Sequence, residues 1–103
     1  MLQSPLTPEI QAEVDRDLAP IRVEIDAVDA QLLRLLNERA KLAQRVGEVK
    51  QKYAQPVYRP ERESVVLEKI AAQNPGPLPT ATLQTLWREV MSACRAMEEP
   101  VKV

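Results

Sequence analysis

Apolar side chains recur at alternating spacings of three and four residues through the first half of the chain. The series is Leu18, Ile21, Ile25, Val28, Leu32, Leu35, Leu42, Val46, Val49 and Tyr53, and Arg39 takes one place within it. This spacing places the side chains on one face of an α-helix, in the heptad pattern of helices that pack against another helix. Pro20 fits the first helical turn and Pro56 follows the end, which predicts a helix of about 35 residues and ~50 Å. A helix of this length needs a partner to cover its apolar face.

Two shorter helices are predicted in the second half of the chain. Pro60 can begin the first, which runs to about Gln73 and ends before a segment of Asn, Pro, Gly and Pro. The second runs from about Thr80 to Glu98, with Pro100 beyond its end. No segment has the alternation of a strand, phenylalanine is absent and glycine occurs only twice. The predicted fold is therefore all-α, with one long and two shorter helices.

Residues 1–17 lie ahead of the regular pattern and carry two prolines. Thr7 and Pro8 can cap and begin a short helix there. We therefore expect an N-terminal extension over residues 1–17, a folded domain over residues 18–99 and the start of a linker over residues 100–103.

Length, charge and residue usage exclude several classes of protein. The 103 residues are enough for one small domain, and the formal net charge of −1 gives no basic field that would attract nucleic acid. Without histidine and with Cys94 as the one cysteine, the chain has no internal disulfide, Cys/His zinc site or histidine-based triad. Two separated glycines cannot form a phosphate-binding loop. We find no export signal or long apolar run, so we expect a cytoplasmic protein without a membrane span.

A charged residue interrupts the apolar face of the long helix. Arg39 lies between Leu35 and Leu42, where a guanidinium needs an anion because an unpaired buried charge is costly. That anion is either a carboxylate of the protein, in a pair that fixes the helix register, or a bound molecule. Lys50 lies three turns further along nearly the same face, ~16 Å away. It is either solvated or converges with Arg39 on a small anion.

Arg22 is a third cation of the long helix. It precedes Arg39 by about 25 Å along the helix, which is too far for both to share a site within one chain. If two copies pair antiparallel about an axis near Leu32 and Leu33, Arg22 of one copy lies opposite residues 39–50 of the other. Alternatively, Arg22 is an exposed residue of the first helical turn.

Further candidate residues follow the long helix. Arg59, Arg62 and Glu63 belong to the sequence Tyr-Arg-Pro-Glu-Arg-Glu, which either closes a site or forms a solvated charged turn. Cys94 and Glu98 lie on the apolar face of the third helix. Glu98 either points inward or frays into solvent at the helix end.

Five short motifs become specific when their order and spacing are considered together. They are Ile21-Arg22-x-x-Ile25-Asp26-x-x-Asp29, Leu35-Leu36-Asn37-Glu38-Arg39, Val46-Gly47-x-x-Lys50, Pro56-Val57-Tyr58-Arg59-Pro60-Glu61-Arg62-Glu63 and Arg88-Glu89-Val90-Met91-Ser92-Ala93-Cys94. Over nearly all of residues 18–99 the chain resembles the all-helical chorismate mutases, most closely the mutase domain that begins bifunctional chorismate mutase/prephenate dehydratases. Residues 100–103 resemble the junction at which the dehydratase domain starts.

The resemblance implies an intertwined homodimer of three-helix subunits with antiparallel long helices. It also implies the rearrangement of chorismate to prephenate, on the route to phenylalanine and tyrosine, without a cofactor or metal. A concerted rearrangement needs no nucleophile and no proton shuttle, which agrees with the absence of histidine. It requires instead that the two carboxylates of the substrate are held so that the ether folds into a chair-like conformer.

On the matching positions, the resemblance assigns roles to most of the candidate residues. Arg39 and the partner's Arg22 would hold the two carboxylates, and Lys50 would reach a carboxylate and the ether oxygen. Arg62 and Glu63 would line the side of the ring hydroxyl, with Glu63 accepting its hydrogen bond.

The chain departs from its relatives at three of these positions. Arg59 stands where relatives can carry a carboxylate, and it receives no defined role. Cys94 and Glu98 stand where relatives can carry Ser and Gln, so Cys94 is expected only to line the pocket. A carboxyl group donates to the ether oxygen only when protonated. If Glu98 is catalytic together with Lys50 and Arg39, the rate therefore falls as the pH rises.

Two other functions fit parts of the pattern. A non-catalytic helical dimerisation or regulatory module explains the heptads but not the combination of Arg39, Lys50, Arg62, Glu63 and Arg22. An isochorismate-pyruvate lyase resembles the mutases in fold and in its cationic pocket. Release of pyruvate would distinguish the lyase from the mutase.

Overall fold

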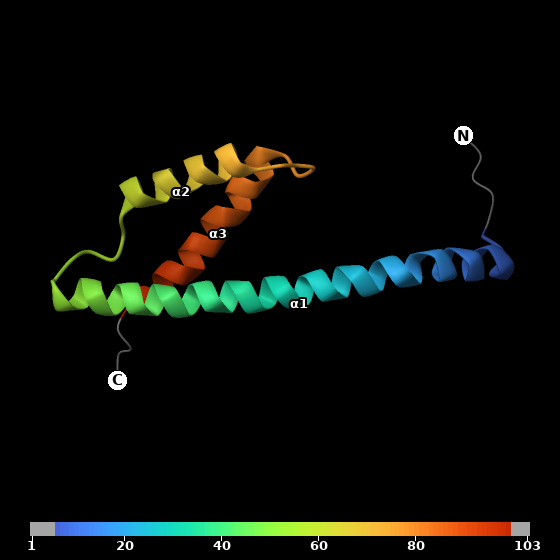
Figure 1. The fold of residues 1–103 in the computed structure, drawn as a ribbon, viewed down its shortest axis with the longest axis horizontal. Coiled ribbons are helices and arrows are strands. Elements are labelled where there is room, and N and C mark those ends of the chain that lie inside the picture. Colours follow the sequence, from blue (N-terminus) through green and yellow to red (C-terminus); the bar gives the residue numbers. More distant parts are fainter. Residues whose placement is uncertain (1–5, 100–103) are drawn as a thin grey trace. The chain divides into compact units, whose positions relative to one another are not determined.

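The computed structural model describes residues 6–99, which form three α-helices and no strand (Figure 1). Helix α1 spans Pro8–Lys52, α2 spans Pro60–Gln73 and α3 spans Thr80–Glu98. The predicted all-α fold with one long and two shorter helices is confirmed, and the bounds of the two shorter helices agree with those expected from the sequence. The linker expected at residues 100–103 lies outside the described residues.

Helix α1 begins at the predicted cap. The backbone N–H of Ile10 donates to Oγ1 of Thr7 at 3.2 Å, and that of Gln11 donates to the Thr7 carbonyl oxygen at 2.9 Å. Pro8 is the first helical residue, where its missing N–H leaves no helical hydrogen bond unmade. The polar cap at the first turn therefore fixes where the helix starts.

The expectation of a separate short helix before a long one is wrong. Helix α1 runs without interruption for 45 residues, and Pro20 lies inside it instead of in a first turn. Proline removes one backbone hydrogen bond but has a φ that suits a helix, and the neighbouring Leu18, Ala19 and Arg22 are strong helix formers. The local propensity of the neighbours therefore outweighs the cost of one proline.

The described residues divide into two compact units, the first ending at Leu35 and the second beginning at Leu36. The first unit is the N-terminal part of α1, and its apolar face is open to solvent. Ile21, Ile25, Val28 and Leu32 are each 50–54% exposed. Large apolar side chains in such a row are usually covered by another chain.

The second unit comprises the C-terminal part of α1 together with α2 and α3. Its core is small: Ala43, Met91 and Cys94 are buried. Helices α2 and α3 pack against each other, and Nε2 of Gln84 on α3 donates to the carbonyl oxygen of Leu67 on α2 at 3.3 Å. The three helices thereby hold their side chains around a common space.

The side chain of Asn74 stabilises the connection between α2 and α3 through hydrogen bonds. Its Nδ2 donates to the carbonyl oxygen of Leu78 at 2.8 Å and to Oγ1 of Thr80 at 3.0 Å. Its Oδ1 accepts from the backbone N–H of Gly76 at 2.9 Å, and Gly76 has a φ of +73°, which glycine adopts without strain. The predicted break between the helices is therefore a hydrogen-bonded turn.

None of the helices within residues 6–99 combines the length and the apolar character needed to cross a membrane.

Candidate active site

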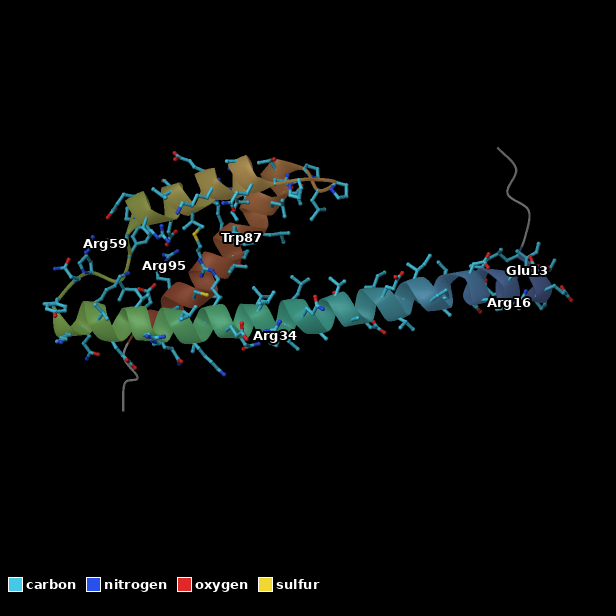
Figure 2. All side chains as sticks on the ribbon, viewed as in Figure 1. Glu13, Arg16, Arg34, Arg59, Trp87 and Arg95 are labelled. Carbon is cyan, nitrogen blue, oxygen red and sulfur yellow. The ribbon has the colours of Figure 1, made fainter. Side chains whose placement is uncertain are left out.

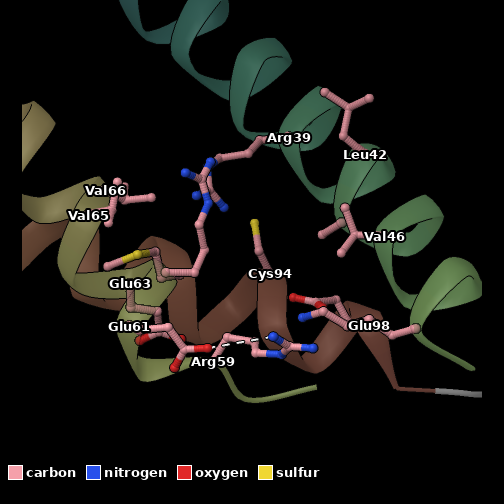
Figure 3. A pocket seen from close by; sticks show the side chains of 14 residues that line it. Arg39, Leu42, Val46, Arg59, Glu61, Glu63, Val65, Val66, Cys94 and Glu98 are labelled. Atoms are coloured by element: carbon pink, nitrogen blue, oxygen red, sulfur yellow. Dashed lines mark hydrogen bonds and ion pairs between the residues drawn. The ribbon is translucent and has the colours of Figure 1, made fainter. Parts of the chain in front are cut away.

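A cavity of about 720 Å³ lies within the second unit, between α1, α2 and α3 (Figure 3). Its apolar walls are Leu42, Ala43, Val46, Val65, Val66, Met91 and Cys94. Its charged lining is Arg39, Lys50, Arg59, Glu61, Arg62, Glu63 and Glu98. All predicted site residues except Arg22 therefore surround one space. Arg22 lies in the first unit, on an exposed stretch of α1.

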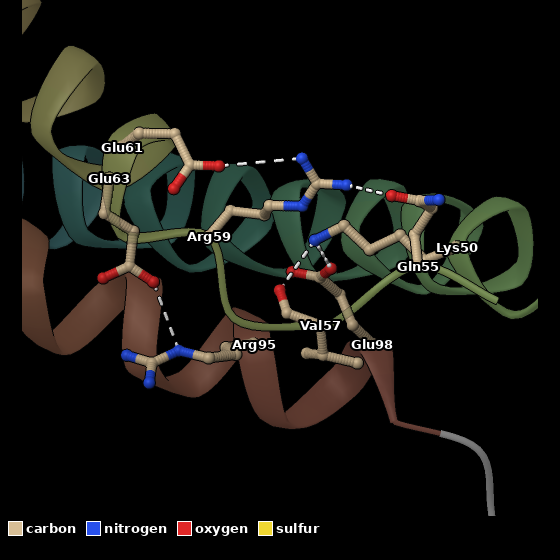
Figure 4. A network of polar contacts seen from close by, with 8 residues as sticks. All are labelled: Lys50, Gln55, Val57, Arg59, Glu61, Glu63, Arg95 and Glu98. Atoms are coloured by element: carbon tan, nitrogen blue, oxygen red, sulfur yellow. Dashed lines mark hydrogen bonds and ion pairs between the residues drawn. The ribbon is translucent and has the colours of Figure 1, made fainter.

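Lys50 is held in the cavity by two hydrogen bonds. Its Nζ donates to Oε1 of Glu98 at 2.6 Å and to the carbonyl oxygen of Val57 at 2.7 Å (Figure 4). The side chains of Lys50 and Glu98 are only 17% and 14% exposed. Glu98 therefore points inward and does not fray into solvent. An ammonium group has three donors, so one N–H of Lys50 is left for a ligand.

Gly47 explains how Glu98 comes so close to α1. A Cβ atom on Gly47 would lie 2.7 Å from Cα of Glu98 and closer still to its carbonyl oxygen. Any other residue would push the end of α3 away from α1, because carbon atoms do not approach so closely. The glycine thus permits the contact between Lys50, one turn later, and Glu98.

Arg59 lies in the connection before α2, and Arg95, which is outside the cavity lining, lies on α3 (Figure 2). Nη2 of Arg59 donates to Oε1 of Gln55, and Nη1 lies 3.6 Å from Oε1 of Glu61. Its buried Nε has no hydrogen-bond partner within the described residues. Arg59 therefore retains a donor, although Gln55 and Glu61 hold its two terminal nitrogens.

Glu63 is paired from outside the cavity. Nε of Arg95 lies 3.2 Å from Oε2 of Glu63, and the Arg95 guanidinium stacks over the ring of Tyr58, 4.5 Å from its centroid. The ion pair lacks the alignment of a hydrogen bond, so its attraction is mainly between the two charges. Through these two contacts, Arg95 on α3 is linked to Glu63 on α2 and to Tyr58 in the connection before α2.

The cavity contains more positive charge than its own carboxylates neutralise. Glu98 pairs with Lys50, Glu61 with Arg59, and Glu63 with Arg95. Within residues 6–99, the guanidinium groups of Arg39 and Arg62 have neither a hydrogen bond nor an ion pair with the protein. Within residues 6–99, no carboxylate is therefore the anion that the sequence requires for Arg39. Two unpaired guanidiniums beside apolar walls suit an anionic molecule that has an apolar part.

No ligand set for a metal ion is present within residues 6–99, where no three His, Cys, Asp or Glu side chains come together. Cys94 is a free, buried thiol. It lines the cavity, and the expectation that it has no further role stays a prediction.

Residues 21–99 match the sequence profile of the family described as chorismate mutase type II. The chain belongs to this family. It is 51% identical over 90 residues to a bifunctional chorismate mutase/prephenate dehydratase of Neisseria gonorrhoeae, a match covering 87% of this chain and 24% of that protein. A protein of the same description from Aquifex aeolicus is 46% identical over 91 residues, covering 84% of this chain and 25% of that protein. The chain thus spans about a quarter of the length of these relatives.

The fold agrees with that of a solved chorismate mutase. A structure of the enzyme from Thermus thermophilus has a TM-score of 0.80 and 36% identity to this chain. The match covers 84% of this chain and 99% of that one. The resemblance inferred from the five motifs is therefore confirmed at the level of family and fold.

Sequence reasoning missed two charged residues near the site. Glu61 lies within the Pro-Glu-Arg-Glu turn, two residues after Arg59, and this spacing is the sequence signal for their pairing. Arg95 gave none, because its partner Glu63 lies on another helix and the pairing depends on how α2 and α3 pack.

Gly47→Ala provides a test of the close contact between α1 and α3. Alanine raises helix propensity by about 1 kcal/mol relative to glycine, whereas overpacking costs about 1–3 kcal/mol or more. Because the added Cβ would meet backbone, which cannot rotate away, we expect the melting temperature to fall. The control is Gln44→Ala, an exposed position on the same helix, measured at equal protein concentration. A higher melting temperature for Gly47→Ala would show that helix propensity decides and that the contact is not tight.

Proposed function

We propose that the chain catalyses the rearrangement of chorismate to prephenate in the biosynthesis of phenylalanine and tyrosine. The observation that carries this proposal is the charge balance of the cavity. Its three carboxylates each have a cation, while Arg39 and Arg62 are unpaired within the described residues. Chorismate is a dicarboxylate with an apolar ring, and it supplies the negative charge that such a cavity lacks.

The first task of the site is to fix the reacting conformer. Arg39 and the partner's Arg22 hold the two carboxylates, and guanidinium groups do so with defined geometry because they can donate two parallel hydrogen bonds. Val46, Val65 and Met91 provide apolar walls for the ring. Holding both ends of the molecule brings the two reacting carbons together, which lowers the entropic part of the barrier.

The second task is to stabilise the charge that develops as the C–O bond breaks. Negative charge grows on the ether oxygen, so a donor aimed at this atom binds the transition state more strongly than the substrate. Lys50 keeps one N–H for this purpose, because Glu98 and Val57 occupy the other two. Glu98, which accepts from Lys50 through Oε1, would be the second donor through Oε2 when that oxygen carries a proton. No covalent intermediate is needed.

The third task is to recognise the ring hydroxyl. Glu63 lines the cavity at the start of α2, where a carboxylate oxygen can accept a hydrogen bond from the ring hydroxyl. Arg62 lies on the same side and keeps its guanidinium available. Arg59 retains its Nε donor but is assigned no step.

We further propose that the active molecule is a homodimer with antiparallel α1 helices. The exposed apolar face at Ile21, Ile25, Val28 and Leu32 supports this assembly. So does a second cavity, of about 780 Å³, whose lining includes four members of the same heptad series in the second unit: Leu42, Val46, Val49 and Tyr53. Antiparallel pairing about an axis near Leu32 brings the partner's Arg22 opposite residues 39–50.

A cytoplasmic location is also part of the proposal, and fluorescence imaging of the tagged full-length protein would check it.

Arg39→Ala should abolish most of the activity. Removal of a charged group that holds substrate and transition state typically costs about two to three orders of magnitude in rate. We would follow the loss of chorismate by ultraviolet absorbance and identify prephenate as the product, with Lys41→Ala, an exposed neighbour, as the control. A folded wild-type protein that leaves chorismate unchanged would refute the proposed function, and pyruvate among the products would indicate the lyase instead.

Mixing two inactive variants tests whether Arg22 acts across the dimer. In a heterodimer of Arg22→Ala and Arg39→Ala chains, one site carries both defects and the other carries neither. Random pairing of equal amounts should therefore restore about a quarter of wild-type activity. Activity would be measured after co-expression of the two chains. If the mixture is as inactive as each variant alone, Arg22 does not complete the partner's site.

The pH dependence tests the role of Glu98. Because its carboxyl group donates to the ether oxygen only when protonated, kcat/KM of the wild type should fall as the pH rises. Glu98→Gln places an amide, which donates at every pH, and should flatten the profile. Profiles of the two proteins would be compared with Glu99→Gln, a control one residue away. Parallel profiles for wild type and Glu98→Gln would remove Glu98 from the mechanism.

A further inference from the structure

We propose that Arg95 is a positioning residue that orients Glu63 for recognition of the ring hydroxyl of the substrate. The inference rests on the proposed function, because it concerns how one group of that site selects its ligand. Arg95 does not line the cavity. It acts from behind the wall, through its contact with Glu63.

The geometry shows an anchored arginine. Its Nε lies 3.2 Å from Oε2 of Glu63, and its guanidinium stacks over the Tyr58 ring, 4.5 Å from the centroid. The side chains of Arg95 and Glu63 are 33% and 26% exposed. A surface ion pair between two mobile side chains has little effect. Here the aromatic ring restricts the guanidinium on one face, so the carboxylate faces a cation with a defined position.

The consequence for Glu63 is a choice between its two oxygen atoms. Oε2 faces Arg95, so Oε1 remains as an acceptor for the substrate. A carboxylate with one oxygen held loses less freedom when it accepts a hydroxyl hydrogen bond than one that rotates freely. Arg95 therefore increases the preference of the site for a substrate that carries this hydroxyl.

The charge of Arg95 also keeps the cavity cations available. Glu63 is next to Arg62 in sequence, and both line the cavity with Arg39. Without the outside cation, the Glu63 carboxylate would turn to the neighbouring Arg62 guanidinium and away from the ring hydroxyl of the substrate. Because Arg95 neutralises Glu63 from outside, Arg62 and Arg39 remain unpaired within the described chain.

The test compares two substrates. One is chorismate, and the other is the chorismate analogue in which hydrogen replaces the ring hydroxyl. For Arg95→Gln we expect kcat/KM for chorismate to fall about tenfold, as for loss of one hydrogen bond to a charged group. The value for the analogue should change by less than about twofold, because it makes no hydrogen bond for Arg95 to support. Arg95→Lys keeps the positive charge but lacks a guanidinium that stacks on Tyr58. Its kcat/KM for chorismate should lie between those of Arg95→Gln and the wild type.

Two comparisons complete the experiment. Arg88→Gln removes the same charge from an exposed position of the same helix and should leave both substrates unaffected. Glu63→Gln should lower kcat/KM for chorismate, and adding Arg95→Gln to it should cause little further loss, because the two residues act as a unit.

The outcomes separate the two proposals. Equal losses for both substrates in Arg95→Gln would assign Arg95 a structural role only, and no loss for either would show that Glu63 is positioned without it. Either result overturns this inference while the activity of the wild type upholds the proposed function. A folded wild-type protein that converts neither substrate would overturn both.

Discussion

The organisation of the second unit follows from one electrostatic requirement, which is that a guanidinium on the apolar face of a helix must have an anion. Arg39 occupies such a position in the heptad series of α1, and no carboxylate within residues 6–99 pairs with it. Three carboxylates, those of Glu61, Glu63 and Glu98, line the same cavity. Each is already paired with another cation, so we infer that a bound molecule completes the charge balance.

The packing of the helices determines which cation pairs with which carboxylate. Gly47 allows α3 to approach α1, and this approach brings Glu98 to Lys50. Tyr58 and Arg95 perform the corresponding task for Glu63. In both cases a residue that does not line the cavity decides where a charged group of the cavity is held.

Much of this arrangement could be predicted from the sequence, because its signals are local. Prolines and the Asn-Pro-Gly-Pro segment fix the ends of the two short helices, and Thr7 identifies the first turn of α1. The predicted helix start at Pro20 was wrong, because proline is tolerated within a helix when its neighbours favour helix strongly. The heptad series placed Arg39 and Lys50 on one face of α1, and both line the cavity. Arg95 could not be found in this way, because its pairing with Glu63 depends on the packing of α3 against α2.

A crystal structure of the protein with a bicyclic dicarboxylate that mimics the chair-like transition state would test the proposed site most directly. We expect one carboxylate on Arg39, the other on the partner's Arg22, and the ether oxygen within hydrogen-bond distance of Lys50 and Glu98. Glu63 should accept from the hydroxyl while keeping its pair with Arg95. A mimic bound outside this cavity, or an Arg39 paired with a protein carboxylate in its presence, would contradict the requirement from which the proposed function follows.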